Sequence, residues 1–497
     1  MNLHFHQLIK GTGILSLAGI MEKGVAFILL PLYTRYLTPA DYGAVELFLI
    51  LLAIMDIIVS QGMDSAVMKR ILYDKGGQPI EAYRPAISTA ITYVFCCSLM
   101  AGTLMILFSG RIAPLLFDQS GYTKLLAFGA GILLCQATYK VMAAPLRAAQ
   151  KYATVAGISF IIFCAKLAGN LICLLYLDAG FASLIYGSFC GAVVSVIATG
   201  IFARKYLAWG FDRDELRRLM KFGFPLIFSA IGFLLLSATD RILLKGLALN
   251  AHVGLAHVGL YSIAAKLVFV ANALALAPFR SAWPTVYYRI ARESGAKQTF
   301  ANFALRFFAI GLLATLAAHW FAPSALVLLT TPDFYAAAPA VGFLMAALVL
   351  FALNDILKVG MNIEARTHLL PIRVLLAASL NVILGVILIP RWGIVGAAAA
   401  TMIAYLFMDA FTIWACRNFY RIKYDWWSVG KLSVLAAALF LVPSLVPLHQ
   451  MVHDPLHQRI LDLGLKSVLL GIFLLATLHI TKIDLTRLLR RSPGGVA

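Results

Sequence analysis

The sequence is poor in charge, in enzyme motifs and in paired cysteines. Charged residues make up 13% of its 497 residues and hydrophobic residues 62%, whereas a soluble chain of this length carries about a quarter charged residues. It contains no P-loop, no glycine-rich dinucleotide turn and no GxSxG motif, so it lacks the common phosphate-binding and hydrolase signatures. The seven cysteines form no CxxC pair, and neither a disulfide framework nor a zinc site is indicated. These absences argue against an enzyme and against a resident cofactor.

Long apolar runs occupy most of the chain instead. Stretches of about 20 apolar residues, each long enough to cross a bilayer as a helix, recur from end to end. They are continuous rather than alternating, which excludes a membrane β-barrel. We therefore expect an all-α integral membrane protein with about 14 transmembrane helices. The expected spans are residues 11–37, 43–68, 86–108, 124–145, 153–177, 182–203, 222–245, 260–283, 303–328, 340–363, 372–389, 394–416, 429–448 and 460–480.

The net charge of +19 follows from the distribution of Lys and Arg between loops. With the N-terminus inside, the inside loops and tails hold most of the bases and the outside connectors hold few. That asymmetry is the positive-inside pattern, and it predicts that both termini are cytoplasmic. The excess of basic residues is thus explained by membrane topology, and no nucleic-acid partner is expected.

The sequence also contains an internal repeat at an offset of about 211 residues. Asn170 in the fifth expected span corresponds to Asn381 in the eleventh, and Gly180 in the following turn corresponds to Gly393. An offset of six spans predicts two pseudo-symmetric six-helix lobes with the substrate between them. We assign residues 1–205 to an N-lobe, 206–424 to a C-lobe that opens with a linker helix capped by Asp212, and 425–497 to two further helices and a cytoplasmic tail.

Charged side chains interrupt several spans, although each costs roughly 2.5–3.5 kcal/mol at the bilayer centre. Three local pairs are expected to neutralise themselves, namely Glu22–Lys23, Asp355–Lys358 and Asp462–Lys466. Asp56, Lys166 and Lys266 have no partner within their own helix, which indicates a polar cavity. The alternative, that the eight bases and eight acids of the spans simply pair, stays open.

Helical spacing groups these charges into faces. Glu46 and Asp64 are an integral number of turns apart on the second span, with Asp56 nearby, and Lys266 and Arg280 share a face of the eighth. A histidine triplet at positions 449, 453 and 457 has the spacing of metal ligands on a helix. Pro455 would break that helix, so we expect a polar loop and no metal.

The segment Leu30–Gly43, with the sequence LPLYTRYLTPADYG, resembles the start of Wzx-type O-antigen and polysaccharide flippases. These form the polysaccharide branch of the multidrug/oligosaccharidyl-lipid/polysaccharide exporter superfamily. Asp240-Arg241, the VGLY motif at 258–261 and Ala265–Leu267 resemble the start of that family's second lobe, and Leu388–Ile394 resembles its turn between the eleventh and twelfth spans. One departure is the tandem AHVGL at 251–260, which lengthens an outside turn.

The resemblance implies two lobes in a V in the bacterial cytoplasmic (inner) membrane, working by alternating access. It implies a flippase, a monomer, that carries an undecaprenyl-pyrophosphate-linked oligosaccharide and works beside a polysaccharide polymerase complex. The substrate-binding residues would be Lys166, Arg241, Lys266, Arg280, Lys140 and Asn170. Asp56, Asp64, Glu46 and Asp240 would carry a coupling proton or sodium ion, with the ion gradient as energy source. The alternatives are a multidrug or cation antiporter of the same superfamily and a membrane enzyme of glycan assembly.

Overall fold

The structure, a computed structural model, consists of helices and the turns that join them. It describes residues 27–72, 79–117, 123–208, 210–248, 250–364, 366, 368–445 and 455–481, and no strand occurs among them. Ten of the described helices are long and apolar enough to cross a membrane. The predicted all-α membrane class is confirmed. The expected fourteen spans do not appear as fourteen helices, because α16 (Leu369–Cys416) covers two of them and most of the first lies outside the described residues.

The chain divides into two compact units. The first runs to Lys266 and includes Leu329–Phe334 and Ile389–Ile394, and the second holds the remainder from Leu267 onward. The lobe boundary expected at residue 205 stays a prediction. The helices of the first unit are α2 (Leu30–Tyr36), α3 (Pro39–Ser60), α4 (Met63–Leu72), η1 (Ile80–Tyr83), α5 (Arg84–Leu107), α6 (Ser109–Phe117), α7 (Thr123–Ala148), α8 (Tyr152–Leu175), α9 (Ala182–Ala203), η3 (Arg204–Tyr206), α10 (Arg213–Gly246) and most of α11 (Ala251–Ala271).

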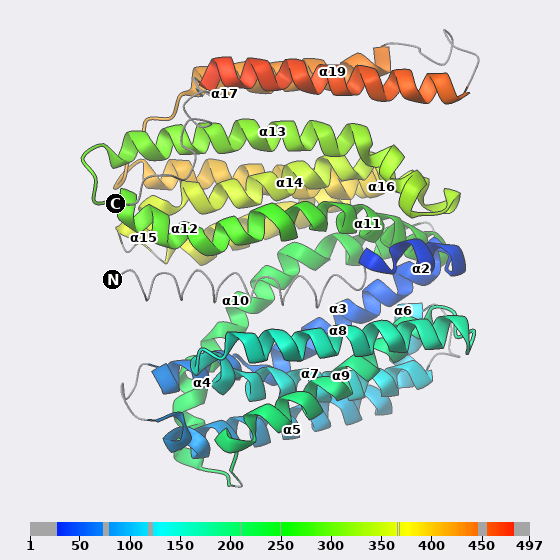
Figure 1. Cartoon of the computed structure of the whole chain (residues 1–497), viewed down its shortest axis with the longest axis vertical. Coiled ribbons are helices and arrows are strands. Elements are labelled where there is room, and N and C mark those ends of the chain that lie inside the picture. The colour runs from blue at the N-terminus through cyan, green and yellow to red at the C-terminus, as the bar shows by residue number, and fades with distance from the viewer. Residues whose placement is uncertain are drawn as a thin grey trace. The chain divides into compact units, whose positions relative to one another are not determined.

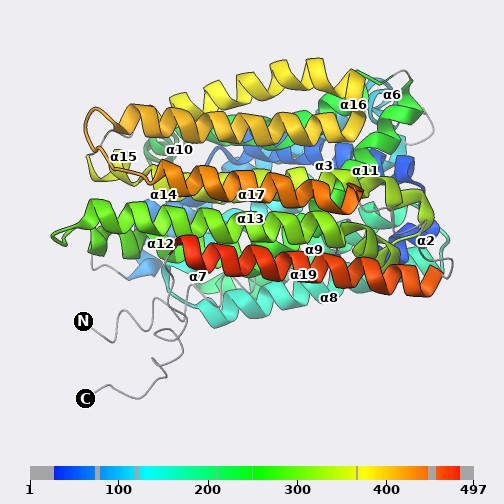
Figure 2. The ribbon, with the colours of Figure 1, turned by 90° about the horizontal axis from the view of Figure 1, so that it is seen from above.

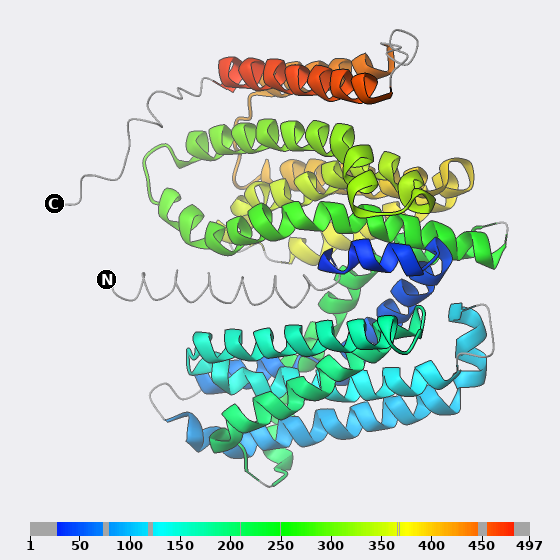
Figure 3. The same ribbon diagram turned by 45° about the vertical axis from the view of Figure 1, so that its right-hand side comes forward.

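In the first unit, α5, α7, α9 and α8 pack in that order as neighbours (Figures 1 and 3). Small residues allow close packing here. A Cβ at Gly187 of α9 would overlap Asn170 of α8, so the buried Asn170 is seated against bare backbone. Gly180, in the turn that joins these helices, has a φ of +53°, a conformation that suits glycine.

The second unit contains η4 (Asn272–Leu276), α12 (Ala277–Ile290), α13 (Ala296–Leu329), η5 (Pro332–Ala337), α14 (Ala338–Leu357), α15 (Val359–Ile363), the greater part of α16, α17 (Trp426–Leu445) and α19 (Pro455–Thr481). Figure 2 shows α13, α17 and α19 running alongside one another. An apolar core that includes Trp320 of α13, Leu432 of α17 and Phe473 of α19 joins these three helices.

Two local features break the expected helical registers. Gln61 and Gly62 have φ values of +45° and +65°, so the second expected span consists of two helices, α3 and α4. A π-helical segment, Asn272–Leu276, follows α11, and each π turn shifts the facing of the residues beyond it. The single faces predicted for Glu46 with Asp64 and for Lys266 with Arg280 are therefore wrong.

The linker ahead of α10 is fixed to the first unit. Asp212 caps the helix as predicted, since its side chain accepts the backbone N–H groups of Asp214 and Glu215. The carboxylate of Glu215 accepts two hydrogen bonds from Arg70 of α4, of 2.9 and 2.7 Å. The backbone N–H of Asp212 donates to Thr89 of α5 at 2.9 Å. The cap opens one continuous helix of 34 residues rather than a short linker helix.

Candidate substrate and coupling site

A largely buried ion pair of the first unit joins α3 to α11. Lys266 Nζ lies 2.9 Å from Glu46 Oε1, and their side chains are 19% and 14% exposed. The Tyr42 hydroxyl also accepts from Lys266, and the ammonium lies 4.2 Å from the centre of the Tyr42 ring. Lys266 is thus held by a carboxylate, a hydroxyl and an aromatic face, each of which favours its charged form.

Two glycines bring α3 and α11 close enough for this pair to form. A Cβ added at Gly43 would overlap the carbonyl of Leu255, and one at Gly259 would overlap the carbonyl of Pro39. Both positions therefore require the absence of a side chain. Glu46 lies one turn beyond Gly43 and Lys266 two turns beyond Gly259, so the contact fixes the spacing of the helices beside the pair.

Two further bases gather near Glu46. Arg241 of α10 and Lys166 of α8 lie close enough to attract its carboxylate. Arg241 donates to Ser262 Oγ at 3.1 Å and lies over the ring of Tyr261, 5.5 Å from its centre. Side chains from four helices, Glu46, Lys166, Arg241 and Lys266, thus interact electrostatically, and Lys266 contacts the carboxylate directly. We name these four residues the Glu46 cluster.

Asp240 and Asp56 bind groups on other helices. Asp240 is 4% exposed and accepts the hydroxyl of Tyr261 at 2.6 Å. Asp56 of α3 forms an ion pair with Lys140 of α7, and the two side chains are 15% and 43% exposed. The Lys140 end of this pair therefore lies at the surface of the described structure, whereas Asp56 is largely buried.

Asp64 lies half-buried on α4, beyond the break at Gln61 and Gly62. The structure therefore does not bring it onto the same helical face as Glu46, and its predicted coupling role stays a prediction.

Lys166 also borders a small polar cavity of about 40 Å³. Gln136, Tyr139, Ser188 and Ser195 line it. Asn170, one turn along α8, is 1% exposed and donates to the backbone carbonyl of Lys166 at 2.7 Å. Asn170 therefore supports the backbone that carries Lys166.

Arg280 belongs to a different group of charges, in the second unit. It forms an ion pair with Asp355 of α14, which also binds Lys358. The local pair predicted for Asp355 and Lys358 is confirmed. The guanidinium of Arg280 lies 4.4 Å from the centre of the Phe351 ring, a cation–π contact. The structure therefore places Arg280 in a separate cluster from Lys266.

Sequence reasoning missed two buried members of the second unit. Arg373, which was not among the predicted site residues, lies on α16, which begins at Leu369; it is 6% exposed, with Nε and Nη1 lacking partners in the described structure. Asp409 was likewise not among the predicted site residues. It is 4% exposed and accepts from Asn354 at 2.7 Å.

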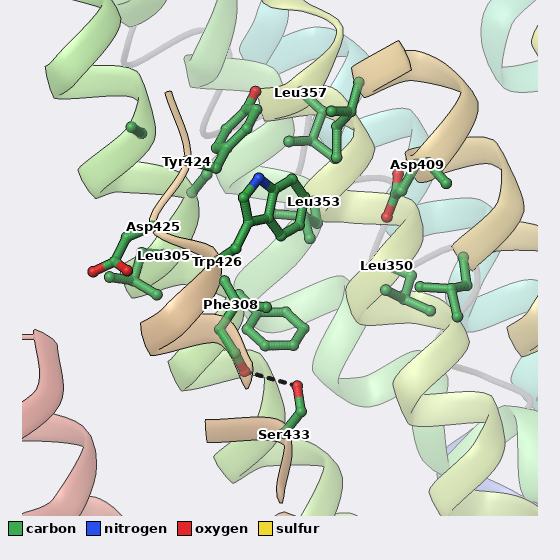
Figure 4. Close-up of a pocket in the computed structure, with 16 residues that line it drawn as sticks. Leu305, Phe308, Leu350, Leu353, Leu357, Asp409, Tyr424, Asp425, Trp426 and Ser433 are labelled. Atoms are coloured by element: carbon green, nitrogen blue, oxygen red, sulfur yellow. Dashed lines mark hydrogen bonds between the residues drawn. The ribbon is translucent and has the colours of Figure 1, made fainter. Parts of the chain in front are cut away.

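Asp409 borders an apolar cavity of about 240 Å³, with Leu353, Phe308 and Trp426 among its walls. Figure 4 shows Asp409 and Asp425 on different sides of this cavity. An apolar wall around two carboxyl groups is a poor place for a phosphate, since nothing cationic lines it. The adjacent Asn354 and Asp355, an amide and an acid within an apolar run, were the sequence feature that could have indicated a buried polar site in this region.

No group of His, Cys, Asp and Glu suited to a metal ion occurs among the described residues. The triplet at 449, 453 and 457 falls on residues whose side chains lie outside the described part of the chain.

A family model described as polysaccharide biosynthesis protein matches residues 32–331, more than half of the chain. An uncharacterized membrane protein of Methanocaldococcus jannaschii is 26% identical over 283 residues. That match covers 55% of this chain and 54% of the relative, so the chain spans about half the length of the curated relative it matches.

Among solved structures, the lipid II flippase MurJ in an inward closed conformation is similar, with a TM-score of 0.70 and 14% identity over 93% of this chain and 98% of that chain. An inward-facing multidrug resistance transporter of the MATE family has a TM-score of 0.61 and 15% identity, over 80% and 95% of the two chains. A MOP superfamily transporter of Pyrococcus furiosus has a TM-score of 0.55 and 14% identity, over 83% and 97%. These likenesses establish the fold.

Proposed function

Because this chain belongs to the polysaccharide biosynthesis protein family, we propose that it is a flippase for an undecaprenyl-pyrophosphate-linked oligosaccharide, an O-antigen or exopolysaccharide repeat unit. The substrate would move from the cytoplasmic to the outer leaflet of the bacterial cytoplasmic membrane, with both termini of the protein in the cytoplasm. The observation that carries the proposal is the Glu46 cluster, in which three bases interact with one acid. A pyrophosphate needs such bases, Arg for paired hydrogen bonds and Lys as point charges.

In the empty site, the carboxylate of Glu46 supplies the negative charge that the substrate's pyrophosphate would bring. While the site is empty, its carboxylate neutralises part of the repulsion among Lys166, Arg241 and Lys266. An arriving pyrophosphate offers more negative charge and more acceptor oxygens than one carboxylate, so it takes over the ammonium of Lys266. The Tyr42 ring and hydroxyl keep that ammonium in place during the exchange. No covalent step is involved.

Coupling to an ion gradient would use the paired carboxylates. Uptake of a proton or sodium ion by Asp56 releases Lys140 and changes the charge of the pair by one unit. Two charge states that differ in their preferred conformation are sufficient to drive alternating access. Glu46, Asp64 and Asp240 remain the other proposed carriers, Arg280, Lys140 and Asn170 the further proposed contacts of the substrate, and the protein would act as a monomer beside a polysaccharide polymerase complex.

The proposal is tested in a strain that lacks this protein and makes the corresponding glycan. We expect lipid-linked oligosaccharide to accumulate in the inner leaflet and surface polysaccharide to disappear. Wild-type protein should restore surface polysaccharide fully and Lys266→Arg partly. Lys266→Gln should not restore it. The matched control is Lys205→Gln, which removes a lysine whose side chain is 50% exposed and paired with Glu81; it should restore polysaccharide fully. Full restoration by Lys266→Gln at wild-type protein levels would refute the assigned role.

A cationic-drug antiporter is the second candidate from the same superfamily. The excess of bases around Glu46 disfavours a cationic ligand, because each base repels it. Resistance to cationic drugs on overexpression, together with unaltered surface glycan in the deletion strain, would instead establish the antiporter.

A further inference from the structure

A pocket in the second unit, mainly apolar but with two charged side chains in its wall, is lined by other residues than the Arg280–Asp355 cluster and the cavity at Asp409. Its volume is about 350 Å³, and its walls include His319 and Trp320 of α13, the first residues of α14, Phe440 of α17, and Asp462 and Lys466 of α19. Three of these helices share the apolar core around Trp320, so the pocket is framed by fixed elements.

Two ring nitrogens in this wall lack partners within the described structure. Trp320 is 3% exposed and its Nε1 has no acceptor, although a buried donor without a partner costs about 1–3 kcal/mol. The His319 ring stacks on Phe440 with centroids 4.3 Å apart, and its Nδ1 also has no partner. A Cβ at Gly342 would overlap this ring, so the His319 ring fits against α14 because residue 342 is glycine. Both nitrogens are buried rather than open to the pocket, so the polar groups that the wall offers to a ligand are those of Asp462 and Lys466.

The same wall carries one charge of each sign. Lys466 Nζ lies 2.5 Å from Asp462 Oδ2, as the predicted local pair requires, and the side chains are 13% and 37% exposed. A purely anionic ligand would meet Asp462 as well as Lys466, and a purely cationic ligand would meet the reverse. A ligand with both a phosphate and an ammonium group satisfies both side chains at once.

The position of the pocket indicates where such a ligand comes from. It lies next to the turn between α13 and α14 and near the start of α19, the ends that face outward in the orientation proposed above. α19 exposes apolar side chains at Leu461, Val468 and Ile472, which suits a surface in contact with lipid. Headgroups of the outer leaflet are therefore within reach.

We infer that this pocket binds the headgroup of a zwitterionic phospholipid of the phosphoethanolamine class. The phosphate accepts from Lys466, and the ammonium donates to Asp462. Phosphocholine lacks N–H donors for Asp462, and phosphoglycerol lacks the positive charge. The phospholipid stays bound to the protein and is not the transported substrate.

The inference is tested by native mass spectrometry of the full-length protein in detergent, titrated with dioleoyl phosphatidylethanolamine, phosphatidylcholine or phosphatidylglycerol. We expect phosphatidylethanolamine to bind most tightly. Lys466→Gln weakens it about tenfold, the effect of one lost charge-assisted hydrogen bond. Asp462→Asn removes the preference for phosphatidylethanolamine over phosphatidylglycerol, and Lys205→Gln changes nothing.

Equal binding of the three lipids by the wild-type protein would overturn the inference, as would full retention of binding in Lys466→Gln. Competition by millimolar inorganic phosphate would assign the pocket to free phosphate instead. Affinity that follows acyl chain length alone would assign it to lipid tails. The measurement needs neither transport nor a membrane orientation, so its failure and that of the flippase proposal are distinguishable.

Discussion

The pair of Glu46 and Lys266 offers a way to separate a structural role from a transport role. Lys266→Met removes the ammonium and leaves a carboxylate that is 14% exposed. Breaking a fully buried ion pair costs about 3–5 kcal/mol. Arg241 and Lys166 still attract Glu46, and some solvent reaches it, so we expect a loss of about 2–3 kcal/mol in the free energy of unfolding.

The second substitution, Glu46→Gln, tests the origin of that loss. Replacing a buried ion pair by neutral groups of similar volume is often close to neutral for stability. The double variant, Glu46→Gln with Lys266→Met, should therefore recover most of the stability, giving a coupling energy of about 1.5 kcal/mol or more in the cycle. Thermal and denaturant unfolding of the purified protein in one detergent measure all four forms.

Transport distinguishes the two roles. The double variant should be nearly as stable as the wild type and yet fail to restore surface polysaccharide, because the pyrophosphate has lost its lysine. Restored polysaccharide in the double variant would refute the reasoning, since the pair would then serve folding alone. A coupling energy near zero would refute the claim that the two side chains interact in the folded protein.

Three further predictions concern other parts of the first unit and the turn in α16. Gly43→Ala should destabilise the protein by about 1–3 kcal/mol in denaturant unfolding, the usual cost of overpacking, because its Cβ would overlap a carbonyl of α11, whereas Gly157→Ala, with open space around its Cβ, should not. The hydrogen bonds from Arg70 lower the pKa of Glu215. The ion pair therefore stabilises the folded protein fully above the ordinary pKa of about 4.3, and this stabilisation is lost as pH falls through the lower pKa of the folded state. Glu215→Gln should thus cost about 1.5–3 kcal/mol in the free energy of unfolding at pH 7 and little at pH 3. Gly393→Ala should cost about 1–3 kcal/mol in the same unfolding assay, because φ is +52° and ψ is −126° there.

Each of these predictions has a contradicting outcome. Equal stability of the two glycine variants would mean that α3 and α11 separate freely. An unchanged stability difference between wild type and Glu215→Gln from pH 7 to pH 3 would mean that the ion pair contributes nothing. Wild-type stability of Gly393→Ala would mean that the turn within α16 relaxes without cost.

The sequence predicted the class of the protein because apolar length and charge distribution act locally. It also predicted that Asn170 and Asn381 occupy equivalent places. Both amides are 1% exposed, and the glycines that follow them, Gly180 and Gly393, both have positive φ. The family resemblance read from the opening segment is confirmed by the matched family model.

The sequence did not predict which charges meet. Glu46 and Lys266 are far apart in the chain and join through helix packing that glycines permit, which spacing on one helix does not reveal. Facing arguments assume an uninterrupted 3.6-residue period, and this assumption fails at Gln61 and again in the π-helical segment. Glu215 of α10 likewise pairs with Arg70 of α4, a contact between helices that the spacing of residues within one helix does not reveal.

The length of α10 has a consequence for how the first unit responds to force. One end of this helix is fastened by Glu215 to Arg70, and the other carries Asp240 and Arg241 (Figure 1). At the usual rise of 1.5 Å per residue these ends are about 39 Å apart. A displacement at the Glu215–Arg70 contact is therefore transmitted along the helix to Arg241, and Pro225 is the interior position where the helix bends most easily. The Glu215–Arg70 contact and the Glu46 cluster are thereby linked through one continuous helix.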